Sequence, residues 1–270
     1  MLGKLIKNEF KANLHTIGMI YVVAAAAILI MMAAFVVKVT WLSALATIVL
    51  MATGALAIVM TFVSVISNFQ KTLFGGQGYL SFTLPVTSGQ LLAAKAITSF
   101  CWMLLSYAVA AGIFIGVYLY ATAMIGEDVK MAIQMLSMMV EGLPDANTVK
   151  LVILLIAFII FVRIIVLIAQ LYFAITLSNT RIMQKLGGFS AVAVFFLVFA
   201  VMQIISVVLT HFVPFSVVLT ADGLFYSTTS TMADPIGLSF GIAGTIFNVV
   251  CGAGLFVATA KLMNSKVNIK

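Results

Sequence analysis

Six long apolar runs constrain this chain more than any other feature of its sequence. They lie at about 17–37, 42–68, 91–125, 149–177, 188–212 and 236–260. A helix needs about 20 apolar residues to cross the hydrocarbon core of a bilayer, and each run reaches that length. Only 8% of the residues are charged, whereas soluble domains average about 25%. We therefore predict an all-α polytopic membrane protein with six transmembrane helices, forming a single transmembrane domain over residues 1–270.

The first 16 residues have a basic amphipathic pattern. One helical face carries Leu2, Leu5, Ile6, Phe10 and Leu14, and the other carries Lys4, Lys7, Asn8 and Lys11. Such a pattern is typical of a helix that lies in the membrane interface. A signal peptide is the alternative, but the apolar run that follows exceeds the 7–15 residues of a signal-peptide core. We expect an interfacial elbow helix at 1–16 that leads into the first span.

Two polar segments between the apolar runs are expected on the outer side of the membrane. Segment 126–148 holds four of the seven acids and a stripe of methionines, which favours a short amphipathic helix on the surface. Segment 213–235 is too short to span and is interrupted by Pro214 and Pro235. We expect a re-entrant or surface helical hairpin there, before the last span.

The basic residues predict the orientation of the chain. With the N-terminus inside, ten of the fourteen Lys and Arg residues fall on the inner side and three on the outer side, and Arg163 lies within a span. Basic residues concentrate in cytoplasmic loops. Both termini and segment 69–90 are therefore predicted to be cytoplasmic. The net charge of +7 is attributed to lysines that face anionic lipid, so we expect no nucleic-acid partner.

Segment 69–90 reads FQKTLFGGQGYLSFTLPVTSGQ and separates the second and third runs. Pro85 biases Leu84 away from the helical conformation, which predicts a turn. Thr87 or Ser88 can then cap a helix that begins near Gln90. A short, rigid loop with apolar side chains suits a docking element better than a reaction centre.

The order aromatic-Leu-Ser-Phe-Thr-Leu-Pro-Val-Thr at 79–87, followed by Leu-Leu-Ala-Ala-Lys at 91–95, resembles the permease subunits of type 2 ABC transporters. In that family the loop after the second span carries a coupling helix that sits in a cleft of a separate ATPase subunit. The resemblance implies that the ATPase is contacted by Tyr79, Leu80, Phe82, Leu84, Pro85, Val86 and Thr87. We expect a secondary contribution from the elbow residues Lys4, Lys7 and Lys11.

The resemblance also implies a function and a set of partners. The chain would be the permease of an ATP-driven exporter in the bacterial cytoplasmic membrane, paired with a second copy of itself or a close paralogue. ATP and Mg would be bound by the ATPase subunit, so this chain needs no cofactor. Compact permeases of this kind often export antimicrobial or toxin-like peptides, and an amphipathic peptide is the expected substrate. A lipid-linked glycan or a small drug are the alternatives.

Polar residues inside the spans are candidates for a translocation pathway. Arg163 lies deep in the fourth run, where a charge costs about 2.5–3.5 kcal/mol on insertion scales, so it should face protein or a water-filled cavity. The other candidates are Gln170 on the same helical face, Gln203 and Ser206 in the fifth run, and Asn248 in the sixth. Interhelical hydrogen bonds are the alternative role for all five residues.

Small residues at four-residue spacing favour close helix packing. One such ridge contains Gly112 and Gly116, and a second contains Gly237 and Gly241. We expect both ridges to pack within one chain rather than against a second copy.

The sequence contains no recognisable catalytic motif. The glycines at 75–78 lack the Gly-Lys-Ser/Thr ending of a phosphate-binding loop, and there is no HExxH motif and no serine elbow. Both cysteines, Cys101 and Cys251, fall inside predicted spans, so neither a disulfide framework nor a metal site is expected. An ion-coupled transporter or channel remains the alternative function. It is disfavoured because coupling ordinarily uses acids within the spans, and none is predicted there.

Overall fold

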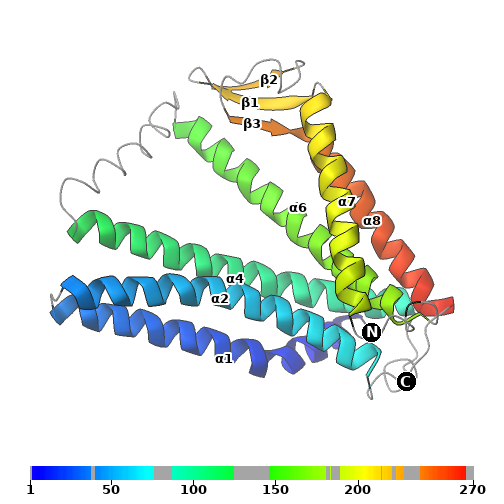
Figure 1. Cartoon of the computed structure of the whole chain (residues 1–270), viewed down its shortest axis with the longest axis horizontal. Coiled ribbons are helices and arrows are strands. Elements are labelled where there is room, and N and C mark those ends of the chain that lie inside the picture. The colour runs from blue at the N-terminus through cyan, green and yellow to red at the C-terminus, as the bar shows by residue number, and fades with distance from the viewer. Residues whose placement is uncertain are drawn as a thin grey trace. The chain divides into compact units, whose positions relative to one another are not determined.

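The computed structural model describes residues 2–37, 40–75, 87–124, 146–180, 183, 189–213, 215–220, 223–227 and 238–265. The elements, in chain order, are α1 (Leu2–Val37), α2 (Thr40–Leu73), α4 (Ser88–Met124), α6 (Ala146–Ser178), α7 (Ser190–Phe212), β1 (Ser216–Thr220), β2 (Gly223–Ser227), β3 (Leu238–Gly241) and α8 (Ile242–Ser265). Within these residues, six helices are long and apolar enough to span a membrane. The six predicted spans are thus confirmed as helices, and the chain has the character of a multi-pass membrane protein (Figure 1).

The first three helices are much longer than a bilayer requires. They contain 36, 34 and 37 residues, which corresponds to roughly 50–55 Å at 1.5 Å per residue. The hydrocarbon core is only about 30 Å thick. The ends of α1, α2 and α4 therefore extend beyond the hydrocarbon unless the helices tilt strongly.

The structure does not confirm a separate elbow at residues 1–16. α1 is one helix from Leu2 to Val37. Asn13 and Ile17 are buried, and the ring of Phe10 lies 5.0 Å from that of Trp102 in α4. The amphipathic pattern therefore arises because the first turns of α1 pack against a protein neighbour. Leu2 and Leu14, assigned to the same apolar face, are exposed.

The chain divides into two compact units, one formed by residues 1–130 with 269–270 and the other by residues 131–268. In the first unit, α1, α2 and α4 lie side by side (Figure 1). Their apolar core contains Ala27, Leu50, Ile113 and Val117. Gly54 of α2 allows close approach, since a Cβ at that position would already touch Ile113 at 3.5 Å. Small side chains at such contacts permit the helix backbones to come near one another.

The second unit contains α6, α7, α8 and the strands. Val162 and Val166 of α6 pack with Met202 of α7, and Cys251 and Leu255 of α8 complete the cluster. The cluster contains side chains from all three helices. It therefore defines which face of each helix points into the core of the second unit.

A small antiparallel sheet lies at the end of α7 in the second unit, with strand order β2-β1-β3 (Figure 1). Residues 213–235 were expected to form a helical hairpin, and the expectation is wrong for the described part, which forms a β-hairpin. The strands are rich in Val, Phe and Tyr, which favour extended structure, and Asp222-Gly223 is a hairpin signal. A backbone hydrogen bond from Ile242 N to Phe215 O, at 3.1 Å, joins the start of α8 to the segment before β1. The sheet is the exception to the predicted all-α fold.

Candidate functional site

Most of the predicted coupling residues lie outside the described part of the chain. These are Tyr79, Leu80, Phe82, Leu84, Pro85 and Val86, and most of the predicted outer loop 126–148 is likewise outside. Thr87 is described, and its Oγ1 accepts a hydrogen bond from the backbone N–H of Gln90 at 3.3 Å. This bond is the capping interaction that the sequence predicted at the start of α4, which begins at Ser88.

The helix before this segment also ends at a defined point. The backbone N–H groups of Phe74 and Gly75 both donate to Gln70 O, at 2.9 and 3.0 Å. A Cβ on residue 75 would lie 2.8 Å from Lys71 O, so the close turn requires glycine there. Leu73 and Phe74 are buried. Residues 76–86 therefore join two helix ends that are each held by specific contacts.

The three elbow lysines are exposed on the first turns of α1. Lys4, Lys7 and Lys11 share this exposed face with Asn8 and His15. Asn13 and Ile17, by contrast, are buried within the unit. The first turns of α1 therefore carry a basic surface, and they belong to a helix that continues to Val37.

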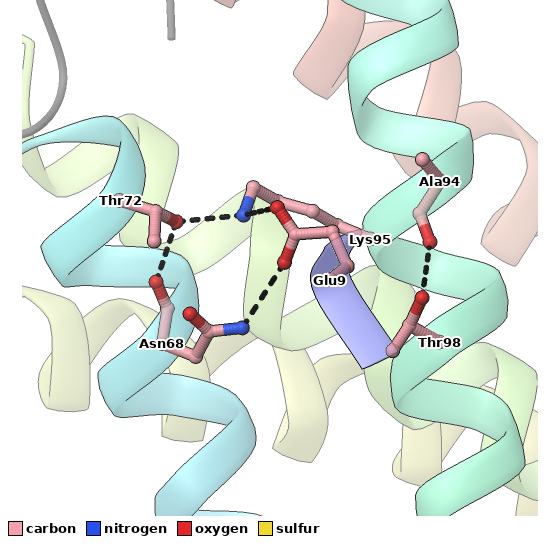
Figure 2. A network of polar contacts seen from close by, with 6 residues as sticks. All are labelled: Glu9, Asn68, Thr72, Ala94, Lys95 and Thr98. Atoms are coloured by element: carbon pink, nitrogen blue, oxygen red, sulfur yellow. Dashed lines mark hydrogen bonds and ion pairs between the residues drawn. The ribbon is translucent and has the colours of Figure 1, made fainter. Parts of the chain in front are cut away.

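A buried ion pair joins the three helices of the first unit (Figure 2). Lys95 Nζ of α4 donates to Glu9 Oε1 of α1 at 2.6 Å and to Thr72 Oγ1 of α2 at 2.7 Å. Asn68 Nδ2 of α2 donates to the other carboxylate oxygen of Glu9 at 3.2 Å. The Lys95 side chain is 2% exposed and that of Glu9 is 16% exposed. Thr72 Oγ1 in turn donates to Asn68 O at 2.6 Å, so the hydroxyl is used as both donor and acceptor.

Sequence reasoning missed this network, which we call the Glu9 network and define as Glu9, Asn68, Thr72 and Lys95. Lys95 was counted as an inner-side cation and Glu9 was not used at all. One signal was present, because Glu9 is the only acid among residues 1–126. Charges on apolar helices are rare and usually pair with one another. A lone acid and a lysine inside such helices could therefore have been predicted to meet.

A second polar group lies deeper in the same unit. The Tyr21 hydroxyl lies 2.8 Å from Ser106 Oγ, which lies 2.7 Å from Thr61 Oγ1. Ser106 and Thr61 are fully buried. The ring of Tyr21 stacks on Trp102 with 6.2 Å between centroids. The buried indole N–H of Trp102 has no hydrogen-bond partner among the described residues. These contacts connect α1, α2 and α4 through hydroxyl groups, which can hold helices together without a charge.

In the second unit, the Arg163 side chain is exposed and contacts one polar side chain of α7. Its Nη1 donates to Gln203 Oε1 of α7 at 2.9 Å. Gln170 is buried and its Nε2 donates to Met202 Sδ at 3.1 Å. Arg163 and Gln170 thus lie along one helix face, as the spacing predicted, but they contact different groups on α7.

Ser206 and Asn248, the remaining pathway candidates, bind each other. Asn248 Nδ2 of α8 donates to Ser206 Oγ of α7 at 2.8 Å and to Gly244 O at 2.7 Å. Both side chains are buried. The five pathway candidates are therefore found in interhelical or local hydrogen bonds.

The glycine ridges behave differently in the two units. A Cβ on Gly112 or Gly116 would meet no atom within 4 Å, so this ridge makes no close helix contact within the described part of the first unit. In the second unit, by contrast, Gly241 at the end of β3 and Gly244 in α8 lie directly against Thr210 of α7. Gly237, the other member of the second predicted ridge, lies outside the described residues.

The described residues contain no group of three or more His, Cys, Asp or Glu side chains that could hold a metal ion. Cys101 and Cys251 are free thiols. No family model matches the chain, and neither a curated protein nor a solved structure is significantly similar to it. The functional assignment therefore depends on the residues and on their geometry.

Proposed function

We propose that this chain is the permease subunit of an ATP-driven ABC exporter and that a separate subunit hydrolyses the ATP. The observation that carries the proposal is the sequence at 79–87, placed between α2 and α4. The capped start of α4 and the glycine-terminated end of α2 support it, because both ends of the segment are held by specific contacts.

The other cytoplasmic surfaces are less suited to receive a motor. In the predicted orientation they are the tail after α8, the connection between α6 and α7, and the first turns of α1. The connection between α6 and α7 is short and mostly polar. The first turns of α1 offer only their basic face, since Phe10 and Asn13 are engaged within the unit. Segment 79–87 combines apolar and aromatic side chains, which usually dominate protein interfaces.

In the proposed cycle, ATP binding closes a pair of ATPase subunits and displaces the two segments that are docked in them. The six helices of each permease then reorient, and the substrate leaves on the outer side. The assembly contains two copies of this chain, or one copy and a close paralogue, in the bacterial cytoplasmic membrane with both termini inside. The preferred substrate is an amphipathic or antimicrobial peptide, with a lipid-linked glycan or a small drug as the alternatives. This chain contributes no catalytic group and no cofactor.

The test replaces two apolar anchors of the segment. Phe82→Ala with Leu84→Ala should weaken co-purification of the ATPase subunit and lower substrate-stimulated ATP hydrolysis by about tenfold or more, as expected when interface anchors worth about 2 kcal/mol or more are lost. The matched control is Val59→Ala with Val63→Ala, two exposed apolar side chains on α2. Normal ATPase binding and normal transport in the Phe82/Leu84 variant would remove the main support for the proposal.

An ion-coupled transporter is the second candidate, and one observation now favours it. Glu9 and Lys95 place a partly buried acid and a buried base within candidate spans, where we predicted no acid. Such pairs occur in ion and proton pathways. Against this, Glu9 lies in the first turns of a helix of about 54 Å, far from its middle. Transport that follows an imposed ion gradient without ATP, and that is lost in Glu9→Gln, would support this candidate.

A further inference from the structure

The Glu9 network lies beside both ends of the segment that joins α2 and α4. Thr72 is the residue before the last one of α2, and Asn68 is one turn earlier. Lys95 is seven residues after Ser88, the first residue of α4, and thus two turns into that helix. Glu9 of α1 accepts hydrogen bonds from Lys95 and from Asn68 (Figure 2). One carboxylate therefore ties α1 to the helix before the segment and to the helix after it.

The arrangement has no substitute partners nearby in sequence. Because Glu9 is the only acid among residues 1–126, a Lys95 ammonium that lost it would find no other carboxylate on the described parts of α1, α2 or α4. Both carboxylate oxygens of Glu9 are bonded, and the Lys95 ammonium also reaches Thr72. A buried pair is favourable only when its geometry and remaining hydrogen bonds are satisfied in this way.

A purely stabilising role explains the ion pair poorly. Replacing a buried ion pair by well-packed apolar residues is often neutral or stabilising, so such a pair is weak support for stability alone. The distinctive property of the ion pair is that it fixes the position of α1 relative to α4. Apolar helix faces can slide over one another at small cost, whereas a charge-assisted bond of 2.6 Å weakens steeply when its partners are displaced.

We propose that Glu9 and Lys95 are positioning residues that make α1 move together with the helices flanking residues 76–86. The mechanical link concerns the first unit alone. Its use in transport rests on the proposed function, in which displacement of the segment by the ATPase would be passed to α1 and from there along its whole length. Asn68 and Thr72 hold the two charged groups in register.

The first experiment measures the link without any ATPase. Spin labels are attached at Lys4→Cys on α1 and Gln90→Cys on α4, both exposed positions, in a background of Cys101→Ser and Cys251→Ser. The purified full chain should give one narrow distance distribution. Glu9→Gln or Lys95→Met should broaden it, and the exchanged pair Glu9→Lys with Lys95→Glu should narrow it again. His15→Gln is the control, since it changes an exposed polar side chain on the same helix.

The second experiment measures transmission in the complex with the ATPase. Glu9→Gln should recruit the ATPase normally but lower transport per ATP hydrolysed by about tenfold or more, within the 5- to 150-fold range of typical coupling energies. The exchanged pair should recover part of this loss, and His15→Gln should show none of it. A structural role alone would lower the yield of folded chain without changing transport per ATP.

The outcomes separate the two claims. An unchanged distance distribution in both neutral variants would overturn the mechanical link. A broadened distribution with normal transport per ATP would overturn its role in coupling. If the wild-type chain recruits no ATPase, the proposed function fails, while the distance measurement still decides whether Glu9 and Lys95 hold α1 to the other two helices.

Discussion

At the scale of single residues, polar contacts that depend on neighbours in sequence could be predicted, and those that depend on tertiary structure could not. Thr87 was predicted as a helix cap because its partner is three residues away. The partner of Glu9 is 86 residues away, and no local pattern says which helices meet. Arg163 was expected to face protein or a water-filled cavity because of the cost of a charge in hydrocarbon. It is exposed with Gln203 as its partner, a contact that requires the α6–α7 packing.

Gly244 provides a test of packing at this scale. A Cβ at this position would lie 2.8 Å from the backbone oxygen of Ser206 and against the Thr210 hydroxyl. Gly244→Ala should therefore push α8 from α7 and destabilise the chain by about 1–3 kcal/mol, the usual cost of overpacking. The measurement is thermal unfolding of the detergent-solubilised protein. Gly254→Ala, in the same helix with no atom within 4 Å, should leave the melting temperature unchanged or raise it. Equal losses in both variants would contradict the α7–α8 packing.

At the scale of elements, helix length and apolarity predicted the six spans well, since a bilayer sets the length of any helix that crosses it. The predicted elbow is not confirmed, and the ambiguity has a physical reason. An amphipathic helix shows the same pattern whether its apolar face meets lipid or protein, and Phe10 meets Trp102. The sheet of the second unit was missed because Pro214 and Pro235 were given more weight than the β-forming residues and the Asp222-Gly223 signal between them.

A comparison of two residues on α1 tests this correction. An interfacial elbow would place both Phe10 and Leu14 in lipid and make them equivalent. In the packed helix Phe10 contacts Trp102, whereas Leu14 is 55% exposed. Phe10→Ala should cost about 2 kcal/mol of unfolding free energy, somewhat less than a fully buried Phe, and shift the fluorescence of Trp102 in a Trp41→Phe background. Leu14→Ala should do neither, and matching effects of the two substitutions would favour the elbow.

At the scale of the whole molecule, the sequence predicts the side of the membrane on which each end of a helix lies. Trp41 and Lys71 are exposed near opposite ends of α2, and the distribution of basic residues places Lys71 inside. In cells that carry the chain without its native cysteines, an impermeant thiol reagent should label Trp41→Cys from outside and should label Lys71→Cys only after permeabilisation. Labelling of intact cells at position 71 would invert the topology and place residues 76–86 beyond the reach of a cytoplasmic motor.

The central claim is that a separate ATP-hydrolysing subunit drives this chain. Neither composition nor helix packing can establish a partner, because residues 76–86 would meet it on a surface that only the complex completes. The most direct measurement is the ATPase activity and subunit composition of the chain purified by affinity from its native membrane in a mild detergent. We expect a second polypeptide with a phosphate-binding loop, and ATP hydrolysis that co-purifies with the chain. Purification of the chain without such a subunit and without ATP hydrolysis would contradict it.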